Sequence, residues 1–139
     1  MSVPVGYADL FDDASRAFLV LATLRDVSEP VVAPVWFVSD ASGLLFTSSP
    51  DAAKTRDIRA RSHVAGIVMA EGDHERYVSV RGQAVELVDP PDEGIDPEEL
   101  HRRIVQRYEG REPTEPFVGV VFRLVPRRLT GYDYRDFAV

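Results

Sequence analysis

Cysteine is absent from this 139-residue chain, and lysine occurs once, as Lys54, among 16 basic residues. Without cysteine there are no disulfides, no thiolate nucleophiles and no zinc sites with sulfur ligands. The three histidines, His63, His74 and His101, lack the spacing of a metal site. The sequence also has no Walker loop and none of the usual motifs of dinucleotide-binding proteins, hydrolases and metalloproteases. Any chemistry is therefore expected to come from a bound cofactor.

Long apolar runs are missing too, since none approaches the roughly 18 residues that cross a bilayer. The first residues, Met1–Pro4, have neither the charged nor the apolar region of a secretion signal. A net charge of −7 disfavours binding to nucleic acid or to an anionic membrane surface. We therefore expect a cytoplasmic protein without nucleic-acid or membrane partners.

With 45% hydrophobic residues the chain has a globular composition, and its length suits one domain over residues 1–139. The patterning predicts an α+β, mainly β fold of six or seven antiparallel strands with three short helices. The expected helices are 8–17, 50–61 and a stretch from Asp96 to Gly110. The expected strands are 18–24, 31–38, 44–47, 64–70, 76–88, 117–125 and 128–134. An acidic, proline-rich connection is expected over 89–99.

A hydroxyl-rich turn leads from the third expected strand into the helix that carries Lys54. Ser49 is expected to cap this helix, with Pro50 in its first position. Thr47, Ser48 and the free N–H groups of the first turn then converge on one spot that Lys54 reaches. This arrangement predicts a phosphate site. An ordinary capped surface helix with a solvated lysine is the alternative.

Pro34 interrupts the second expected strand, because proline removes a hydrogen bond from the strand ladder. The backbone groups of Val35, Trp36 and Phe37 are therefore predicted to be free to bind the edge of a flat polar ligand. A plain edge-strand proline is the alternative interpretation. For Trp36, the only tryptophan, a buried structural role is the alternative.

Residues 76–88 alternate between polar and apolar side chains. Tyr77, Ser79, Arg81 and Gln83 form a polar row on one face of the expected strand, and Gly82 marks an expected bulge. Such a row usually faces water, although in a small barrel it can face a ligand or a partner subunit.

Several segments follow one another in a specific order: 22–24 (Ala-Thr-Leu), 33–37 (Ala-Pro-Val-Trp-Phe), 45–47 before 53–59 (Ala-Lys-Thr-Arg-Asp-Ile-Arg), 80–84 (Val-Arg-Gly-Gln-Ala) and 122–129. Through them the sequence resembles the flavin- and deazaflavin-binding split barrels related to pyridoxamine 5′-phosphate oxidase. The Lys-Thr-Arg-x-[Ile/Leu]-Arg segment is the most specific of these features, and the resemblance covers most of the chain.

The resemblance implies an antiparallel split barrel that forms a homodimer with two coenzymes at its interface. It implies that the strand after Pro34 lies beside the coenzyme ring and that the end of the third strand and Lys54 hold its phosphate. The deazaflavin coenzyme F420 is favoured over FMN, and no catalytic residue is assigned. The expected cofactor-binding residues are Val35, Trp36, Phe37, Thr47, Ser48, Ser49, Lys54 and Arg56.

The sequence departs from the family pattern at two positions near Lys54. Ala52 stands where deazaflavin-binding members often have a basic residue, and Asp57 stands where asparagine is common. The chain also lacks the C-terminal arginine-bearing segment of true pyridoxamine phosphate oxidases, so that activity is not expected.

The expected function is that of an oxidoreductase, a reductase that transfers hydride between a bound deazaflavin or flavin and a small planar substrate. Hydride transfer depends on face-to-face placement in a dry pocket more than on a protein acid or base. The alternative is a non-catalytic split barrel that binds flavin or haem.

Overall fold

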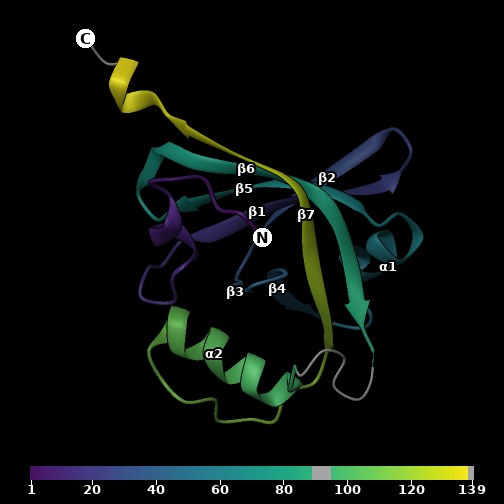
Figure 1. Ribbon diagram of the computed structural model, residues 1–139. Helices are drawn as coiled ribbons and strands as arrows, with labels where there is room; N and C mark the ends of the chain where they lie inside the picture. Colours follow the sequence, from purple (N-terminus) through teal and green to yellow (C-terminus); the bar gives the residue numbers. More distant parts are fainter. Residues whose placement is uncertain (89–94, 138–139) are drawn as a thin grey trace.

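One antiparallel sheet of seven strands makes up most of the computed structural model, which describes residues 1–88 and 95–137 (Figure 1). The predicted mainly β fold is therefore confirmed. The strands are β1 (Phe18–Asp26), β2 (Glu29–Val35), β3 (Val38–Asp40), β4 (Gly43–Ser48), β5 (His63–Ala70), β6 (Asp73–Leu87) and β7 (Val120–Asp133). The helical elements are η1 (Ala8–Phe11), α1 (Ala53–Ala60), α2 (Pro97–Glu109) and η3 (Tyr134–Phe137).

The strand order β2-β1-β5-β6-β7-β4-β3 places two consecutive strands, β2 and β3, at opposite edges of the sheet. Only Trp36 and Phe37 separate these strands in the chain. Three residue steps span at most about 11 Å, so the sheet must curl until its two edges approach each other. We call this junction the seam.

The curled sheet buries one face of every long strand around an apolar core. Its largest fully buried side chains include Leu19, Phe37, Phe46, Phe122 and Leu124. The helix α2 packs against the opposite face of β3, β4 and β7, at the lower end of the sheet in Figure 1. This second cluster contains Leu100, Ile104 and Tyr108 of α2 with Val38, Leu45 and Val121 of the strands.

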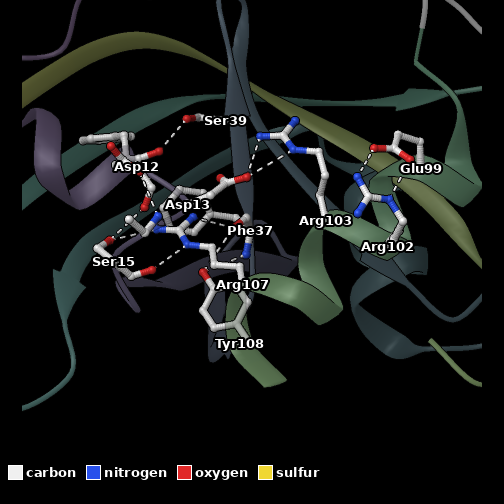
Figure 2. Close-up of polar contacts among 12 residues, drawn as sticks. Asp12, Asp13, Ser15, Phe37, Ser39, Glu99, Arg102, Arg103, Arg107 and Tyr108 are labelled. Atoms are coloured by element: carbon white, nitrogen blue, oxygen red, sulfur yellow. Dashed lines mark hydrogen bonds and ion pairs between the residues drawn. The ribbon is translucent and has the colours of Figure 1, made fainter. Parts of the chain in front are cut away.

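Arg107, near the end of α2, ties the seam to the N-terminal segment (Figure 2). Its guanidinium donates to the carbonyl oxygens of Phe37 at 2.7 Å, Ser15 at 3.0 Å and Leu10 at 3.2 Å. Arg107 is only 7% exposed, and of the three carbonyl oxygens that of Phe37 also lies 3.1 Å from the hydroxyl oxygen of Tyr108. One buried cation therefore joins α2, the seam and the N-terminal segment, which are far apart in the sequence.

Tyr108 completes the closure of the seam. Its hydroxyl donates to the carbonyl oxygen of Ala17 at 2.5 Å and accepts the N–H of Phe37 at 3.2 Å. Both backbone groups of Phe37 are thus bonded within the protein. The prediction that they are free to bind a ligand is wrong, because α2 occupies them.

The expected helix over 8–17 is reduced to the single turn η1, Ala8–Phe11. The side chain of Asp12 accepts the N–H of Ala14 at 2.8 Å, and its carbonyl accepts the N–H of Ser15 at 3.0 Å. This local turn competes with helical hydrogen bonding, as aspartate side chains commonly do.

The strand boundaries also differ from the prediction at two prolines. The expected strand 31–38 is broken at the seam, and Pro34 lies in β2, an edge strand, where its missing N–H is tolerated. The expected strands 117–125 and 128–134 form one strand, β7, that runs through Pro126. Pro126 pairs with Gly82 at a register shift between β6 and β7, so the expected bulge at Gly82 is confirmed.

The predicted ends of α2 are confirmed. Asp96 caps it by accepting the N–H of Glu98 at 3.0 Å, and Gly110 ends it with a φ of 68°. Of the connection expected over 89–99, residues 89–94 lie outside the described chain. Within the described ranges, no helix has the length and apolar character to cross a membrane, and no group of three or more His, Asp or Glu residues is placed to hold a metal ion.

We expect Arg107→Met to lower the free energy of unfolding by about 2–3 kcal/mol, because it leaves buried carbonyl groups without their charged donor. The variant Arg103→Met on the same helix, which loses a partly exposed ion pair to Asp13, should cost about 1 kcal/mol or less. Urea unfolding of both variants measures the difference. Equal losses would show that Arg107 does not hold the seam.

Candidate functional site

The turn before α1 is built differently from the expected serine cap. The helix begins at Ala53, and its N-cap, Ala52, makes no side-chain cap. Instead the carbonyl oxygen of Ser49 accepts the N–H of Ala52 at 3.1 Å, which closes a separate turn through Pro50. The prediction that Ser49 caps the helix is therefore wrong. The first-turn N–H groups of α1 are left without a side-chain acceptor.

Thr55 fixes this turn against the helix. It is fully buried, and its hydroxyl oxygen lies 2.6 Å from the carbonyl oxygen of Ser49 and 2.8 Å from the hydroxyl oxygen of Ser48. Thr47 and Ser48, at the end of β4, pair with β7. The sheet therefore positions Ser48 from one side, and Thr55 of α1 contacts its hydroxyl group from the other.

The structure brings four of the predicted residues, Thr47, Ser48, Ser49 and Lys54, into one hollow of about 590 Å³. Lys54 is half-buried and makes no hydrogen bond or ion pair with any described residue. Burial lowers the pKa of its ammonium group. A half-buried cation without an ion-pair partner among the described residues is electrostatically unsatisfied, and an anionic ligand in the hollow would satisfy it.

The far wall of the hollow comes from α2 and the loop that follows it. His101 and Phe117 line it with their rings 5.5 Å apart, and Pro116 and Val118 are their neighbours. The N–H of Phe117 bonds to the carboxylate of Glu98 at 3.1 Å, which fastens the loop to the start of α2. Sequence reasoning missed this wall, because no local signal links residues so far from Lys54 in the sequence to the hollow.

The chemistry of the hollow suits a phosphate group. Hydroxyl groups, the first-turn N–H groups of α1 and the Lys54 ammonium group are all donors to an anion. Exposed Glu115 also borders the hollow and disfavours a second negative charge on its own side.

Trp36 lies outside this hollow. Its ring stacks on Tyr108 with centroids 4.9 Å apart and an interplanar angle of 3°, and it is 46% exposed. The alternative interpretation, a buried structural role, does not apply, and Trp36 lines a separate hollow of about 320 Å³ with Pro34 and Arg16. Val35 is buried in the core and pairs with Leu19.

Three further positions near Lys54 have distinct surroundings. Arg56 is exposed and donates to the carbonyl oxygen of Asp51 at 2.8 Å, away from the hollow. Asp57 is 8% exposed and lies 3.7 Å from Arg25 of β1, so its charge does not line the hollow. Ala52 does line it, and a cation is therefore missing there.

One protein family matches the sequence through its profile, which is described as pyridoxamine 5′-phosphate oxidase and covers residues 11–131. No curated protein matches the chain at a significant level.

Solved structures share the fold over nearly the whole chain. An F420 reductase has 29% sequence identity and a TM-score of 0.74, with 92% of this chain and 98% of that chain covered. A FAD-binding protein from Mesorhizobium loti has 22% identity and a TM-score of 0.69, with 94% of each chain covered. A conserved hypothetical protein from Mycobacterium tuberculosis has 19% identity and a TM-score of 0.75, with 99% and 90% covered.

We expect Lys54→Met to be as stable as the wild type or more stable at neutral pH, within about 1 kcal/mol, because it removes a half-buried charge and keeps the apolar stem. Burial lowers the pKa of Lys54 below 10.5, so the unfolded chain binds this proton more tightly than the folded chain. Any gain in the stability of the variant is therefore complete at pH values below the lowered pKa. It disappears as the pH rises to the pKa of a free lysine.

Urea unfolding of both proteins from neutral to strongly alkaline pH measures this trend. Arg56→Met is the control, because it removes an exposed cation of the same helix that stays charged over this range. A stability difference between Lys54→Met and wild type that does not change with pH would contradict the partial burial of the ammonium group.

Proposed function

Because the chain belongs to the pyridoxamine 5′-phosphate oxidase family, we propose that it is an oxidoreductase that holds the phosphate of a deazaflavin or flavin coenzyme in the Lys54 hollow. One observation carries this proposal. The only lysine of the chain is half-buried and unpaired among the described residues, and it lies in one hollow with the hydroxyl groups of Thr47, Ser48 and Ser49. A lysine that only stabilised the helix would not need to lie half-buried and unpaired beside three hydroxyl groups.

The proposed reaction is hydride transfer between the coenzyme and a small planar substrate. The coenzyme supplies the hydride, and this chain binds it, orients it and keeps water from the reacting face. Likeness to an F420 reductase at 29% identity supports the deazaflavin coenzyme F420 over FMN. The ring is proposed to lie outward from the Lys54 hollow, since the backbone of Phe37 is bonded to α2.

The proposed active form is a homodimer. The polar row of Tyr77, Ser79, Arg81 and Gln83 lies on the outer face of the sheet, opposite the core residues of β6. The same face exposes large apolar side chains, namely Val32, Val85, Val125 and Tyr132. A second copy that covers this face would remove their apolar surface from water.

A second candidate function is a binding protein without catalysis. Ala52 lines the hollow, at a position where deazaflavin-binding relatives often have a cation, and a weaker phosphate site suits a carrier as well as an enzyme. Coenzyme binding without reduction of any planar acceptor would favour this reading.

For the proposed phosphate site we expect Lys54→Ala to weaken the bound coenzyme about tenfold to a hundredfold, the loss of one charged hydrogen bond worth about 1.5–3 kcal/mol. The loss should shrink at higher salt, because part of the attraction is screened. Fluorescence titration of wild type and variant with FMN and with F420, each at two salt concentrations, measures both effects.

Arg56→Ala is the matched control, since Arg56 lies two residues away and does not border the hollow. The proposal fails if Lys54→Ala and Arg56→Ala have equal effects, or if neither coenzyme binds the wild type.

For the proposed dimer we expect sedimentation to show a two-fold assembly at micromolar concentration. Replacing exposed Val85 by aspartate should shift it towards monomers, because the change places a charge in the covered face. Val27→Asp, in the exposed turn between β1 and β2, serves as control. A wild type that sediments only as a monomer would rule out the dimer.

A further inference from the structure

Twelve of the 16 basic side chains of this acidic protein have an acceptor. All 16 lie in the described part of the chain, and these twelve arginines pair with carboxylates or bond to carbonyl oxygens, as Arg59 does with Glu86 and Arg76 with Asp9. The side chains of the other four make no hydrogen bond, ion pair or ring contact with any described residue: Lys54, Arg81, Arg127 and Arg128. Lys54 lies in the hollow described above. The other three lie together on the outer face of β6 and β7.

A β-bulge brings these three arginines to one place. Arg81 of β6 pairs with Arg128 of β7, whereas the next residue, Gly82, pairs with Pro126. Arg127 is therefore the extra residue of the bulge, and both Arg127 and Arg128 oppose Arg81. Gly82 is needed for this approach, because a Cβ atom there would collide with the carbonyl oxygen of Val125.

Two adjoining hollows surround the three guanidinium groups, and we call them together the arginine groove. Arg81 and Arg127 line the larger one, of about 550 Å³, with His63 and Gln83 as further polar groups. Its apolar walls are Val64, Ala65, Val125 and Pro126. Arg81 and Arg128 line the smaller one, of about 240 Å³, beside Ser79 and Thr130.

The three arginines repel one another in the free protein. Like charges directly opposite each other on neighbouring strands destabilise the pair, and Arg81 faces two of them with no carboxylate among its described contacts. All three are exposed, so water screens part of this repulsion. The protein has 23 acidic residues and pairs its other arginines, so acids are not in short supply. Two counterparts fit this cluster, a carboxylate of the second copy in the proposed dimer and an anion of outside origin, and the sedimentation experiment below distinguishes them.

We propose that the arginine groove binds a small molecule that carries two or more neighbouring phosphate or carboxylate groups. Guanidinium groups bind such anions through paired hydrogen bonds, and the apolar walls give room for the rest of the molecule. The ligand is held between Arg81 on one strand and Arg127 and Arg128 on the other. This site does not depend on the coenzyme site at Lys54.

The test uses isothermal titration calorimetry with inorganic pyrophosphate and citrate, and inorganic phosphate as the single-group comparison. It is done in the Lys54→Met protein, so that the coenzyme hollow does not contribute. We expect the two polyanions to bind more tightly than phosphate and to bind at least tenfold more weakly in Arg127→Gln/Arg128→Gln. Thermal unfolding supplies a second readout, because the polyanions should raise the Tm only where the three arginines are present.

The control is Arg102→Gln/Arg111→Gln, which removes the same charge from arginines that are paired with Glu99 and Glu109. It should leave polyanion binding within about twofold of the parent, whereas loss equal to that of the groove variant would overturn the proposal. Absence of polyanion binding in Lys54→Met, or unchanged binding in the groove variant, would also overturn it. If the double variant does not fold, Arg81→Gln replaces it with the same expected loss. Sedimentation of each protein with and without pyrophosphate separates ligand binding from a change in assembly.

Discussion

The hydrogen bonds of one buried cation, Arg107, fix the geometry on which the rest of the structure depends. A sheet whose two edge strands are separated by two residues must curl, and its edges need something to hold them. Arg107 does this by bonding the carbonyl oxygens of Phe37, Ser15 and Leu10 (Figure 2). The same bonds position α2, and α2 carries His101 into the wall of the Lys54 hollow. The hydrogen bonds that close the barrel therefore also determine the shape of the candidate site.

Those parts of the fold that depend on local patterning were predictable from the sequence. Alternation identified the long strand β6, its outward polar row and its bulge at Gly82, and the capping residues Asp96 and Gly110 marked the ends of α2. Competing local hydrogen bonds caused the main errors. Asp12 replaced a helix by a turn, and the carbonyl of Ser49 moved the start of α1 to Ala53. A residue that favours a helix start also favours a turn, and sequence alone does not decide between them.

The candidate site was predictable only where its residues are close in the sequence. Thr47, Ser48, Ser49 and Lys54 share one hollow because a strand end and a helix start adjoin there. Arg56 does not border this hollow, since residues two apart on a helix point in directions about 200° apart. The wall formed by His101 and Phe117 depends on the docking of α2. Nothing near Lys54 in the sequence encodes that docking.

Net charge alone hides the most informative electrostatic feature of this molecule, which is the pairing of its cations. A charge of −7 argues against large polyanionic partners, yet four cations at two places have no partner among the described residues. The two places differ in chemistry. Lys54 offers a single, partly dehydrated point charge among hydroxyl and N–H donors, which suits one phosphate group. The arginine groove offers three planar guanidinium groups beside apolar walls, which suits an organic ligand with several acidic groups. Exposed arginines that face one another across two strands repel each other only weakly in water, and a polyanionic ligand that binds only the folded state would convert this repulsion into attraction and raise stability.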